Sequence, residues 1–232
     1  ANDTRVEGFV VQATSQGILA ASSSANTILR RIILRGLLVQ PPSGGTLSAN
    51  GIQVRDADSV SVENSIVTGA QQQGLLLKRV TNAYVRNNLV YGIPNDWGIS
   101  FDNTSTGPLP ALSTGNVAAF NTVYGCKFGL RFVNSSGEIR DNLAVANQVK
   151  GIKFDQPDPL SIVHHNDAFG STTNYDPPSS FSLYASNLSV DPLFVDPLSA
   201  NFALSQTSAG QAIQSPVVDA GSGPPALVDM DG

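Results

Sequence analysis

The chain has 232 residues and a net charge of −5, and only 13% of its residues are charged. This length is enough for one domain with a sizeable core. The acidic balance argues against nucleic acid as the main partner, because phosphate binding requires a basic excess. No apolar run approaches the roughly 18 residues that a transmembrane helix needs, and the single cysteine, Cys126, excludes an internal disulfide.

A short phrase that begins with glycine recurs along the chain as GIQVRD, GLLLKR, GISFDN, GLRFVN and GIKFDQ. Its glycines are Gly51, Gly74, Gly98, Gly129 and Gly151, at spacings of 23, 24, 31 and 22 residues, and GILAAS from Gly17 is an earlier member. Apolar and polar letters alternate within each phrase, which is typical of a strand with one buried side.

A second phrase interleaves with the first: VENSIVTG, VRNNLVYG, AAFNTVYG, IRDNLAVA and VHHNDAFG. Its fourth letters are Ser65, Asn88, Asn121, Asn142 and Asn166, and Gly36 and Gly8 are interpreted as earlier members of this column. Asparagine tolerates the left-handed region of backbone conformation, so we expect a tight bend at this position. Stacked asparagine amides can also bond to one another.

Each period of about 22 residues thus carries two strand-like phrases, and no segment shows a helical period. The pattern predicts an all-β solenoid of about six coils, in which equivalent positions form columns about 4.8 Å apart. Two apolar columns are expected to face inward, with aromatic residues as core and not as a ligand platform. The first column is Ile52, Leu75, Ile99, Leu130 and Ile152, and the second is Val54, Leu77, Phe101, Phe132 and Phe154.

These repeats resemble those of the single-stranded right-handed parallel β-helix family, over roughly residues 5–170. The resemblance rests on the glycine phrase, the V-x-x-N bend and the spacing of 21–24 residues. The family includes pectate, alginate and chondroitin lyases, epimerases, glycosidases and many secreted proteins, so the fold alone names no reaction. The resemblance, together with few lysines and many Asn, Ser, Thr and Gly, leads us to expect a secreted or cell-surface bacterial protein.

We divide the chain into coils over residues 1–170 and a C-terminal capping segment over 171–232, because the period breaks there. This irregular segment, with its DPLFVDP and VDAG phrases, resembles the segment that follows the last coil in many secreted β-helix proteins. A cap is expected because a bare terminal coil exposes an unpaired edge. Two long connections, over residues 40–50 and 101–115, are either walls of a groove or decorative loops.

The outward letters of the glycine phrase change from coil to coil and form two columns. One column is Gln53, Leu76, Ser100, Arg131 and Lys153, and the other is Arg55, Lys78, Asp102, Val133 and Asp155. Trp97 lies directly before Gly98, and Lys127 precedes the strand of Arg131. In the family that the chain resembles, this strand and its preceding turns form the substrate groove.

The resemblance implies a polysaccharide partner and, as one option, a lyase that acts on a uronate-containing glycan by β-elimination. In that mechanism a base removes the proton next to the carboxylate while a cation neutralises the developing charge. Lys153 beside Arg131 is then the catalytic pair, and Lys78 and Lys127 bind substrate. Trp97 would stack on a sugar ring, and Asp102 and Asp155 would bind substrate, orient the lysine or hold Ca²⁺.

Three alternatives stay open at this point. The chain is a non-catalytic glycan-binding or adhesion module, or a structural surface solenoid whose outward charges only stabilise coil stacking. A glycoside hydrolase fits less well, since Asp102 and Asp155 lie two coils apart, roughly 10 Å, which is marginal for an inverting pair. Whether the protein is an enzyme is left open, and the motifs define no cofactor other than the Ca²⁺ option.

Overall fold

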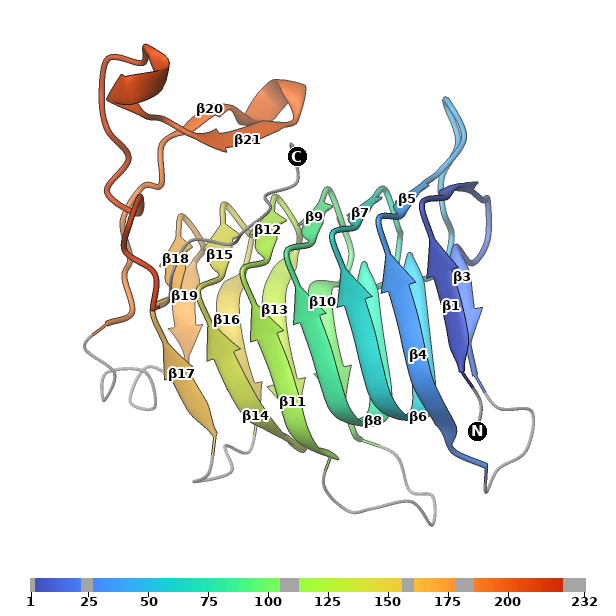
Figure 1. Cartoon of the computed structure of the whole chain (residues 1–232). Helices are drawn as coiled ribbons and strands as arrows, with labels where there is room; N and C mark the ends of the chain where they lie inside the picture. The colour runs from blue at the N-terminus through green and yellow to red at the C-terminus, as the bar shows by residue number, and fades with distance from the viewer. Residues whose placement is uncertain (1–2, 22–26, 105–112, 156–160, 178–185, 223–232) are drawn as a thin grey trace.

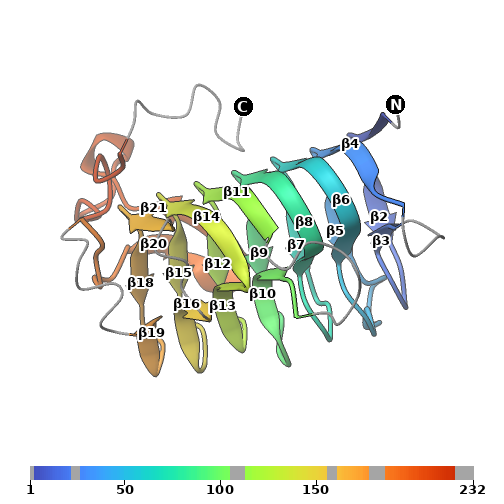
Figure 2. The ribbon, with the colours of Figure 1, turned by 90° about the horizontal axis from the view of Figure 1, so that it is seen from below.

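The chain folds into a parallel β-solenoid, as the repeats predict (Figure 1). The computed structural model describes residues 3–21, 27–104, 113–155, 161–177 and 186–222. Helix is limited, in these ranges, to two 3₁₀ turns, Pro197–Ser199 and Thr207–Ala209. About six coils stack along one axis, and Figure 2 shows their strands following one another in chain order.

Each complete coil contributes three strand segments, which stack into three walls. The first wall consists of β3 (Ile18–Ala20), the first halves of β6 (Ile52–Glu63) and β8 (Leu75–Arg86), β10 (Trp97–Asp102), β13 (Phe128–Val133), β16 (Lys150–Asp155) and β19 (Thr173–Asp176). The second wall consists of β1 (Thr4–Glu7), β4 (Leu29–Arg35), the second halves of β6 and β8, β11 (Ser113–Ala119), β14 (Ser135–Arg140) and β17 (Ile162–His164). The third wall consists of β2 (Val10–Gln12), β5 (Leu38–Gln40), β7 (Ile66–Thr68), β9 (Leu89–Tyr91), β12 (Thr122–Tyr124), β15 (Leu143–Val145) and β18 (Asp167–Phe169).

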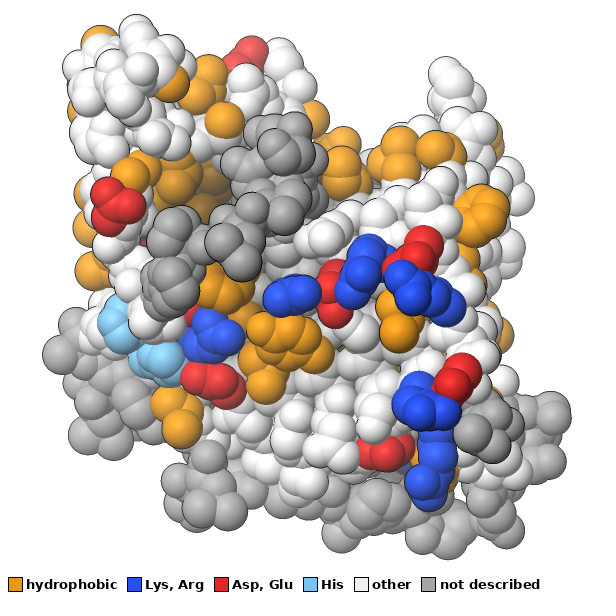
Figure 3. Space-filling model, in the orientation of Figure 1, with side chains coloured by type: hydrophobic (Ala, Val, Ile, Leu, Met, Phe, Trp, Pro, Cys, Tyr) orange, Lys and Arg blue, Asp and Glu red, His pale blue; other side chains and the backbone are white. Residues whose placement is uncertain are grey.

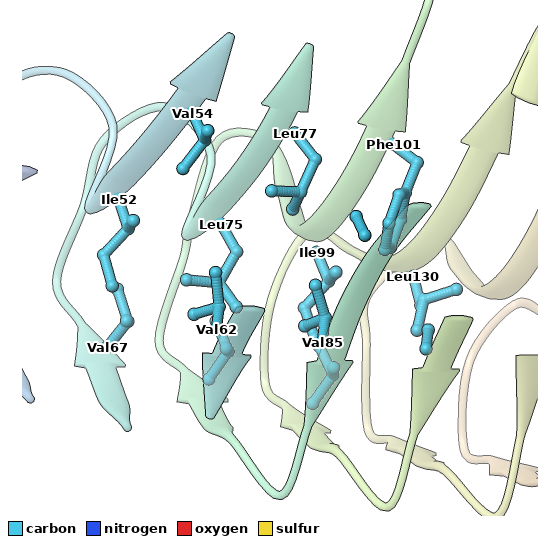
Figure 4. Close-up of a cluster of buried hydrophobic side chains, with 14 of the residues drawn as sticks. Ile52, Val54, Val62, Val67, Leu75, Leu77, Val85, Ile99, Phe101 and Leu130 are labelled. Carbon is cyan, nitrogen blue, oxygen red and sulfur yellow. The ribbon is translucent and has the colours of Figure 1, made fainter. Parts of the chain in front are cut away.

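The two predicted inward columns form the core. The register of the first wall aligns Ile52 with Leu75, and Leu75 with Ile99, as the glycine phrases require. All ten residues of these columns are at most 3% exposed, and Figure 4 shows side chains from successive coils meeting inside the solenoid. Phe101 and Phe132 pack with ring centroids 4.2 Å apart, which confirms that this aromatic column is core.

The glycine that opens each phrase is needed because the next coil passes close to it. A Cβ atom on Gly74 would lie 2.6 Å from the carbonyl oxygen of Gly98 and 2.5 Å from a methyl carbon of Val90. Any side chain there would force neighbouring coils apart. The recurring glycine therefore marks close backbone approach rather than an unusual backbone angle.

The asparagine column is a buried hydrogen-bonded ladder, and the bend lies one residue earlier than predicted. Left-handed backbone occurs at the preceding positions, Asn64, Asn87, Phe120, Asp141 and His165, with φ between 50° and 56°. Gly36 also has left-handed backbone, with a φ of 60°. The residue that aligns with Ser65 is therefore Leu37 and not Gly36. The buried asparagine stands one residue after the left-handed position because the bend turns the following side chain inward.

Turn-to-turn bonding of the asparagines is confirmed. Asn121 accepts bonds on Oδ1 from the backbone N–H of Asn88 at 3.1 Å and from its side-chain amide at 3.0 Å. It donates from Nδ2 to Asn142 Oδ1 and to the carbonyl of Val85, both at 2.9 Å. The ladder runs on through Asn166 to Asn187, and it satisfies backbone groups that would otherwise be buried without partners.

Replacing Asn121 with alanine should lower the free energy of unfolding by about 2–5 kcal/mol. The reason is that the N–H of Asn88 and the carbonyl of Val85 lose buried partners, at about 1–3 kcal/mol each. Urea denaturation followed by circular dichroism measures this loss. The matched control is Asn95→Ala at an exposed position, which should change stability by no more than about 0.5 kcal/mol. Equal effects of both substitutions would contradict a stabilising role for the ladder.

The C-terminal part extends the coils and then folds back over their side. β19 pairs with β16, and Asn187 bonds to Asn166, so coil geometry continues beyond residue 170. After that, β20 (Phe194–Asp196) and β21 (Asn201–Leu204) form an antiparallel hairpin. We call residues 186–222 the arm. The hairpin lies over the third wall and not over the end of the solenoid (Figure 1).

Aromatic side chains join the arm to the third wall. Phe202 of the hairpin contacts Tyr91 and Tyr124, with ring centroids 5.3 and 5.0 Å apart. Phe194 lies 5.9 Å from Tyr124 in an edge-to-face arrangement. Aromatic pairs bury large apolar area and contribute about 0.5–1.5 kcal/mol beyond that burial. The arm therefore shields apolar side chains of the third wall that would otherwise face water.

Asp167 is a buried carboxyl group at this junction. It is 2% exposed, and its Oδ1 accepts a bond from the backbone N–H of Val190 at 3.0 Å. Its Oδ2 has no hydrogen-bond partner among the residues that the structure describes. Burial, with a smaller contribution from the charge of Asp191, raises the pKa of Asp167 to about 6. The folded state therefore holds the proton more tightly than the unfolded chain, and ionisation of Asp167 destabilises the fold as the pH rises through 6.

Asp167→Asn should therefore stabilise the protein at about pH 8 by up to about 3 kcal/mol, and much less at about pH 4. The amide keeps an oxygen to accept the bond from Val190 but never ionises. Urea unfolding of both proteins at the two pH values measures the difference. Asp219→Asn at an exposed position is the control and should be nearly neutral at both. A gain that does not depend on pH would refute this account of Asp167.

Candidate functional site

The outward side of the first wall carries the predicted columns in the predicted register. Gln53 pairs with Leu76, Leu76 with Ser100, and Ser100 with Arg131, which pairs in turn with Lys153. The parallel column runs through Arg55, Lys78, Asp102, Val133 and Asp155. We call this surface the first-wall face. The structure therefore brings all seven predicted site residues to one side of the solenoid or to its immediate border.

Arg131 is held by neighbours on the preceding coil. Its Nε donates to Ser100 Oγ at 2.8 Å, and its Nη2 lies 2.9 Å from Asp102 Oδ2. Both charged side chains are partly shielded, at 19% and 12% exposure. The guanidinium also lies over the ring of Trp97, 5.1 Å from the centroid. This cation is fixed in place by three contacts, which favours a defined orientation over free reach into solvent.

Lys153 lies among carboxylates. Its Nζ is 2.5 Å from Asp155 Oδ1 and 3.9 Å from Asp176 Oδ2. Asp176 also binds Lys150 of the neighbouring column. A catalytic base needs a free amine within reach of substrate, so Lys153 would have to leave these ion pairs before it could act. The catalytic roles of Lys153 and Arg131 stay predictions.

Asp176 is a member of this face that the sequence reasoning missed. It pairs in register with Lys153, one coil further on. At the start of its strand, Asn174 stands where earlier coils carry glycine, since the backbone oxygen of Asn174 faces Gly151. The absence of the glycine phrase concealed this coil, and the spacing of 23 residues from Gly151 to Asn174 was the remaining signal.

Trp97 is almost buried, at 5% exposure. Its ring stacks on Phe128 with centroids 4.8 Å apart and an interplanar angle of 20°. Lys127 lies over Phe128, 5.5 Å from that centroid, and Arg131 lies over Trp97 itself. Trp97 therefore packs against one ring and one cation, and little of its own ring is exposed for stacking on a sugar.

Arg55 and Lys78 are the cations of this face without acidic partners. They occupy adjacent coils in direct register, so their Cα atoms lie about 4.8 Å apart. Both side chains are partly exposed. Across the ranges that the structure covers, neither makes an ion pair within 4.0 Å, whereas Arg131, Lys150 and Lys153 each have one. The first-wall face thus presents two adjacent cations on β6 and β8 that form no ion pair among the described residues, and Asp102, the next member of their column, is paired with Arg131.

The predicted Ca²⁺ site does not fit the arrangement of carboxylates. Asp102 faces Arg131 and accepts bonds on Oδ1 from Thr104, while Asp155 faces Lys153. Val133 lies between the two aspartates in their column. Within the described ranges, no group of three or more His, Cys, Asp or Glu residues could hold a metal. These residues supply no shared donor set of the kind Ca²⁺ requires.

The connection over residues 101–115 belongs to β10 and β11 at its two ends, and its centre, 105–112, lies outside the described residues.

The histidines lie on the second wall, away from the first-wall face. There His164 Nε2 is 2.8 Å from Glu138 Oε1, and His165 occupies the left-handed bend.

On the same second wall, acidic and basic side chains alternate over the first coils, from Glu7 through Arg35 and Glu63 to Arg86. Figure 3 shows neighbouring red and blue groups on this side. Glu63 Oε2, for example, lies 3.0 Å from both Arg35 and Arg86. The charges of Glu63, Arg35 and Arg86 therefore compensate one another, in contrast to those of Arg55 and Lys78.

Cys126 is fully buried in the core, and burial raises the pKa of its thiol to about 12. The thiolate is the reactive form of cysteine, so this residue is chemically inert in the folded protein. We expect no reaction with an aromatic disulfide reagent at about pH 8, and one thiol released when the chain is unfolded in guanidinium. Absorbance of the released thiolate reports both. Rapid reaction of the native protein, with its fold intact, would show that Cys126 is accessible.

The geometry above defines a class of protein, a parallel β-solenoid with a charged outer face. A family model described as a right-handed β-helix region matches residues 16–175, so the chain belongs to the right-handed β-helix family. Searches of curated proteins and of solved structures find no match. None of the helical segments in the described residues is long and apolar enough to cross a bilayer.

Proposed function

We propose that this protein binds an acidic polysaccharide along the first-wall face. The observation that carries the proposal is the pair Arg55 and Lys78, two partly exposed cations on adjacent coils that form no ion pair with any residue the structure describes. Their spacing follows the coil repeat of about 4.8 Å. A polymer with one carboxylate on each sugar presents negative charges at regular intervals, so it can meet cations that a solenoid also presents at regular intervals.

The charge distribution favours this partner over a more highly charged one. The whole chain carries a net charge of −5, so the positive region is local, and a long polyphosphate would be repelled elsewhere on the surface. Lys127 on Phe128 and Arg131 on Trp97 offer two further cations backed by rings. A glycan that runs along the solenoid axis passes these groups in turn. Secretion or display on a bacterial surface, where such polymers occur, belongs to the same proposal.

A second candidate function is cleavage of the bound polymer by β-elimination. Arg131 and Lys153 occupy adjacent coils in register, so a cation and an amine lie side by side. Lys153 would take the proton next to the carboxylate, and Arg131 would stabilise the resulting negative charge. The carbon–oxygen bond to the leaving sugar then breaks, the leaving oxygen takes up a proton from the protonated Lys153 or from water, and a double bond conjugated to the carboxylate remains. We place binding first, because both side chains are engaged in ion pairs.

The double variant Arg55→Ala/Lys78→Ala should bind alginate, pectate or chondroitin at least tenfold more weakly, equivalent to about 1.4 kcal/mol. Isothermal titration calorimetry against each polymer measures this change, with neutral dextran as the ligand control. The matched protein control is Arg5→Ala/Arg30→Ala, which removes the same charge from the second wall and should bind as the parent does. Added salt should weaken parent binding, because exposed charges are screened.

The same incubations separate the candidate functions when ultraviolet absorbance of the unsaturated product is followed. Saturable binding with no absorbance change supports a binding module. A rise that Lys153→Ala abolishes, with binding retained, supports a lyase with Lys153 as its base. If none of the three acidic polymers binds to the folded parent, the proposed function is wrong and a structural role is favoured.

A further inference from the structure

A second surface, on the third wall under the arm, contains a notch between aromatic rings. One outward column of this wall aligns Tyr124 with Val145, and Val145 with Phe169. The two rings are thus two coils apart, roughly 10 Å between backbones, and the small valine lies between them. Because valine does not fill the space that a third ring would occupy, the aromatic column is interrupted at this coil.

The arm closes this notch from above. Leu193, Phe194 and Pro197 line its outer side, and the ring of Phe194 lies edge-on to Tyr124, with centroids 5.9 Å apart. The resulting hollow has a volume of about 310 Å³, which lies at the lower end of the range of about 300–1,000 Å³ found for small-molecule sites. We call it the aromatic notch. Figure 1 shows the arm overhanging the strands that carry it.

Negative charge without a counter-ion lies beside the aromatic notch. Asp191 lines the hollow and is exposed, and none of the described residues that line it is a lysine or an arginine. Asp191 makes no ion pair within 4.0 Å in the ranges that the structure covers. Next to it along the arm, Val190 donates to Asp167, whose second carboxyl oxygen is buried without a partner. Among the described residues that line the notch, Asp191 is the one with a charged side chain.

We propose that the aromatic notch binds a small organic cation, a methylated ammonium group of the choline type, between Tyr124, Phe169 and Phe194. The negative faces of aromatic rings attract such a cation, and the attraction is stronger where the cation is shielded from water. The carboxylate of Asp191 adds attraction at the rim. A methylated ammonium has weakly hydrated, apolar outer atoms, so it can also pack against Val145 and Leu193. A strongly hydrated metal ion cannot do so.

Charge and shape can be separated with two ligands of nearly the same size. Choline carries the cation, and 3,3-dimethylbutan-1-ol replaces its nitrogen with a neutral carbon. Chemical shifts in the NMR spectrum of the full chain, followed during titration with each, give the two affinities. We expect saturable binding of choline and at least tenfold weaker binding of the neutral alcohol. Equal affinity for both would overturn the proposal in favour of a simple apolar pocket, and no saturable change with choline would overturn it altogether.

The variant that tests the geometry is Val145→Phe, which continues the aromatic column and fills the notch. Choline binding should be lost, whereas Val145→Ala, which leaves the notch open, should retain it. Circular dichroism and urea unfolding show whether each variant is folded. If Val145→Phe does not fold, Asp191→Asn at the exposed rim remains as the test, with an expected loss of at least threefold in affinity for choline. Unchanged affinity in a folded Val145→Phe would place any choline site elsewhere. Binding of acidic polymers by the first-wall face should be unaffected by either variant at Val145, so the two proposals fail independently.

Discussion

Register between stacked coils is the constraint on which the rest of this structure depends. Parallel backbone hydrogen bonds join each strand to its equivalent one coil away, so residues at equivalent positions of successive coils stack into a column. Inward columns must then be apolar, or polar with partners in the column itself. Asn88, Asn121 and Asn142 satisfy the second condition by bonding to one another and to neighbouring backbone groups inside the core.

The same constraint shapes the outer surfaces. An outward column places side chains about 4.8 Å apart whether or not their charges match. On the second wall, Glu63 lies between Arg35 and Arg86 and compensates both. On the first-wall face, Arg55 is followed by Lys78, and no acid separates them. The charges of Glu63, Arg35 and Arg86 compensate one another and need no functional explanation, whereas two adjacent like charges repel each other and need one.

The arm gives the molecule a feature that a regular solenoid lacks. A bare wall offers shallow surfaces, and a ligand on it stays largely in water. By lying across the third wall, the arm encloses a hollow and places Asp191 at its rim. The two proposed sites therefore differ in kind. The first-wall face is open and suits a polymer, while the aromatic notch is small, partly enclosed and suits a single group.

The sequence by itself determined the solenoid, its inward columns and the register of its outward ones, because a coil repeat imposes the same local demands every 22 or so residues. It did not locate the bend, which lies at Asn87 and not Asn88, since both positions tolerate asparagine. Nor did it identify Asp176, whose coil lacks the glycine phrase. Only the tertiary structure decided that Arg131 and Lys153 form ion pairs, whereas Arg55 and Lys78 form none among the described residues. The reason is that an ion pair can form across coils, as Arg131 does with Asp102, or along one strand, as Lys153 does with Asp155. The placement of the arm was also beyond the sequence, since Phe194 and Phe202 meet Tyr124 through contacts between distant parts of the chain that no repeat encodes.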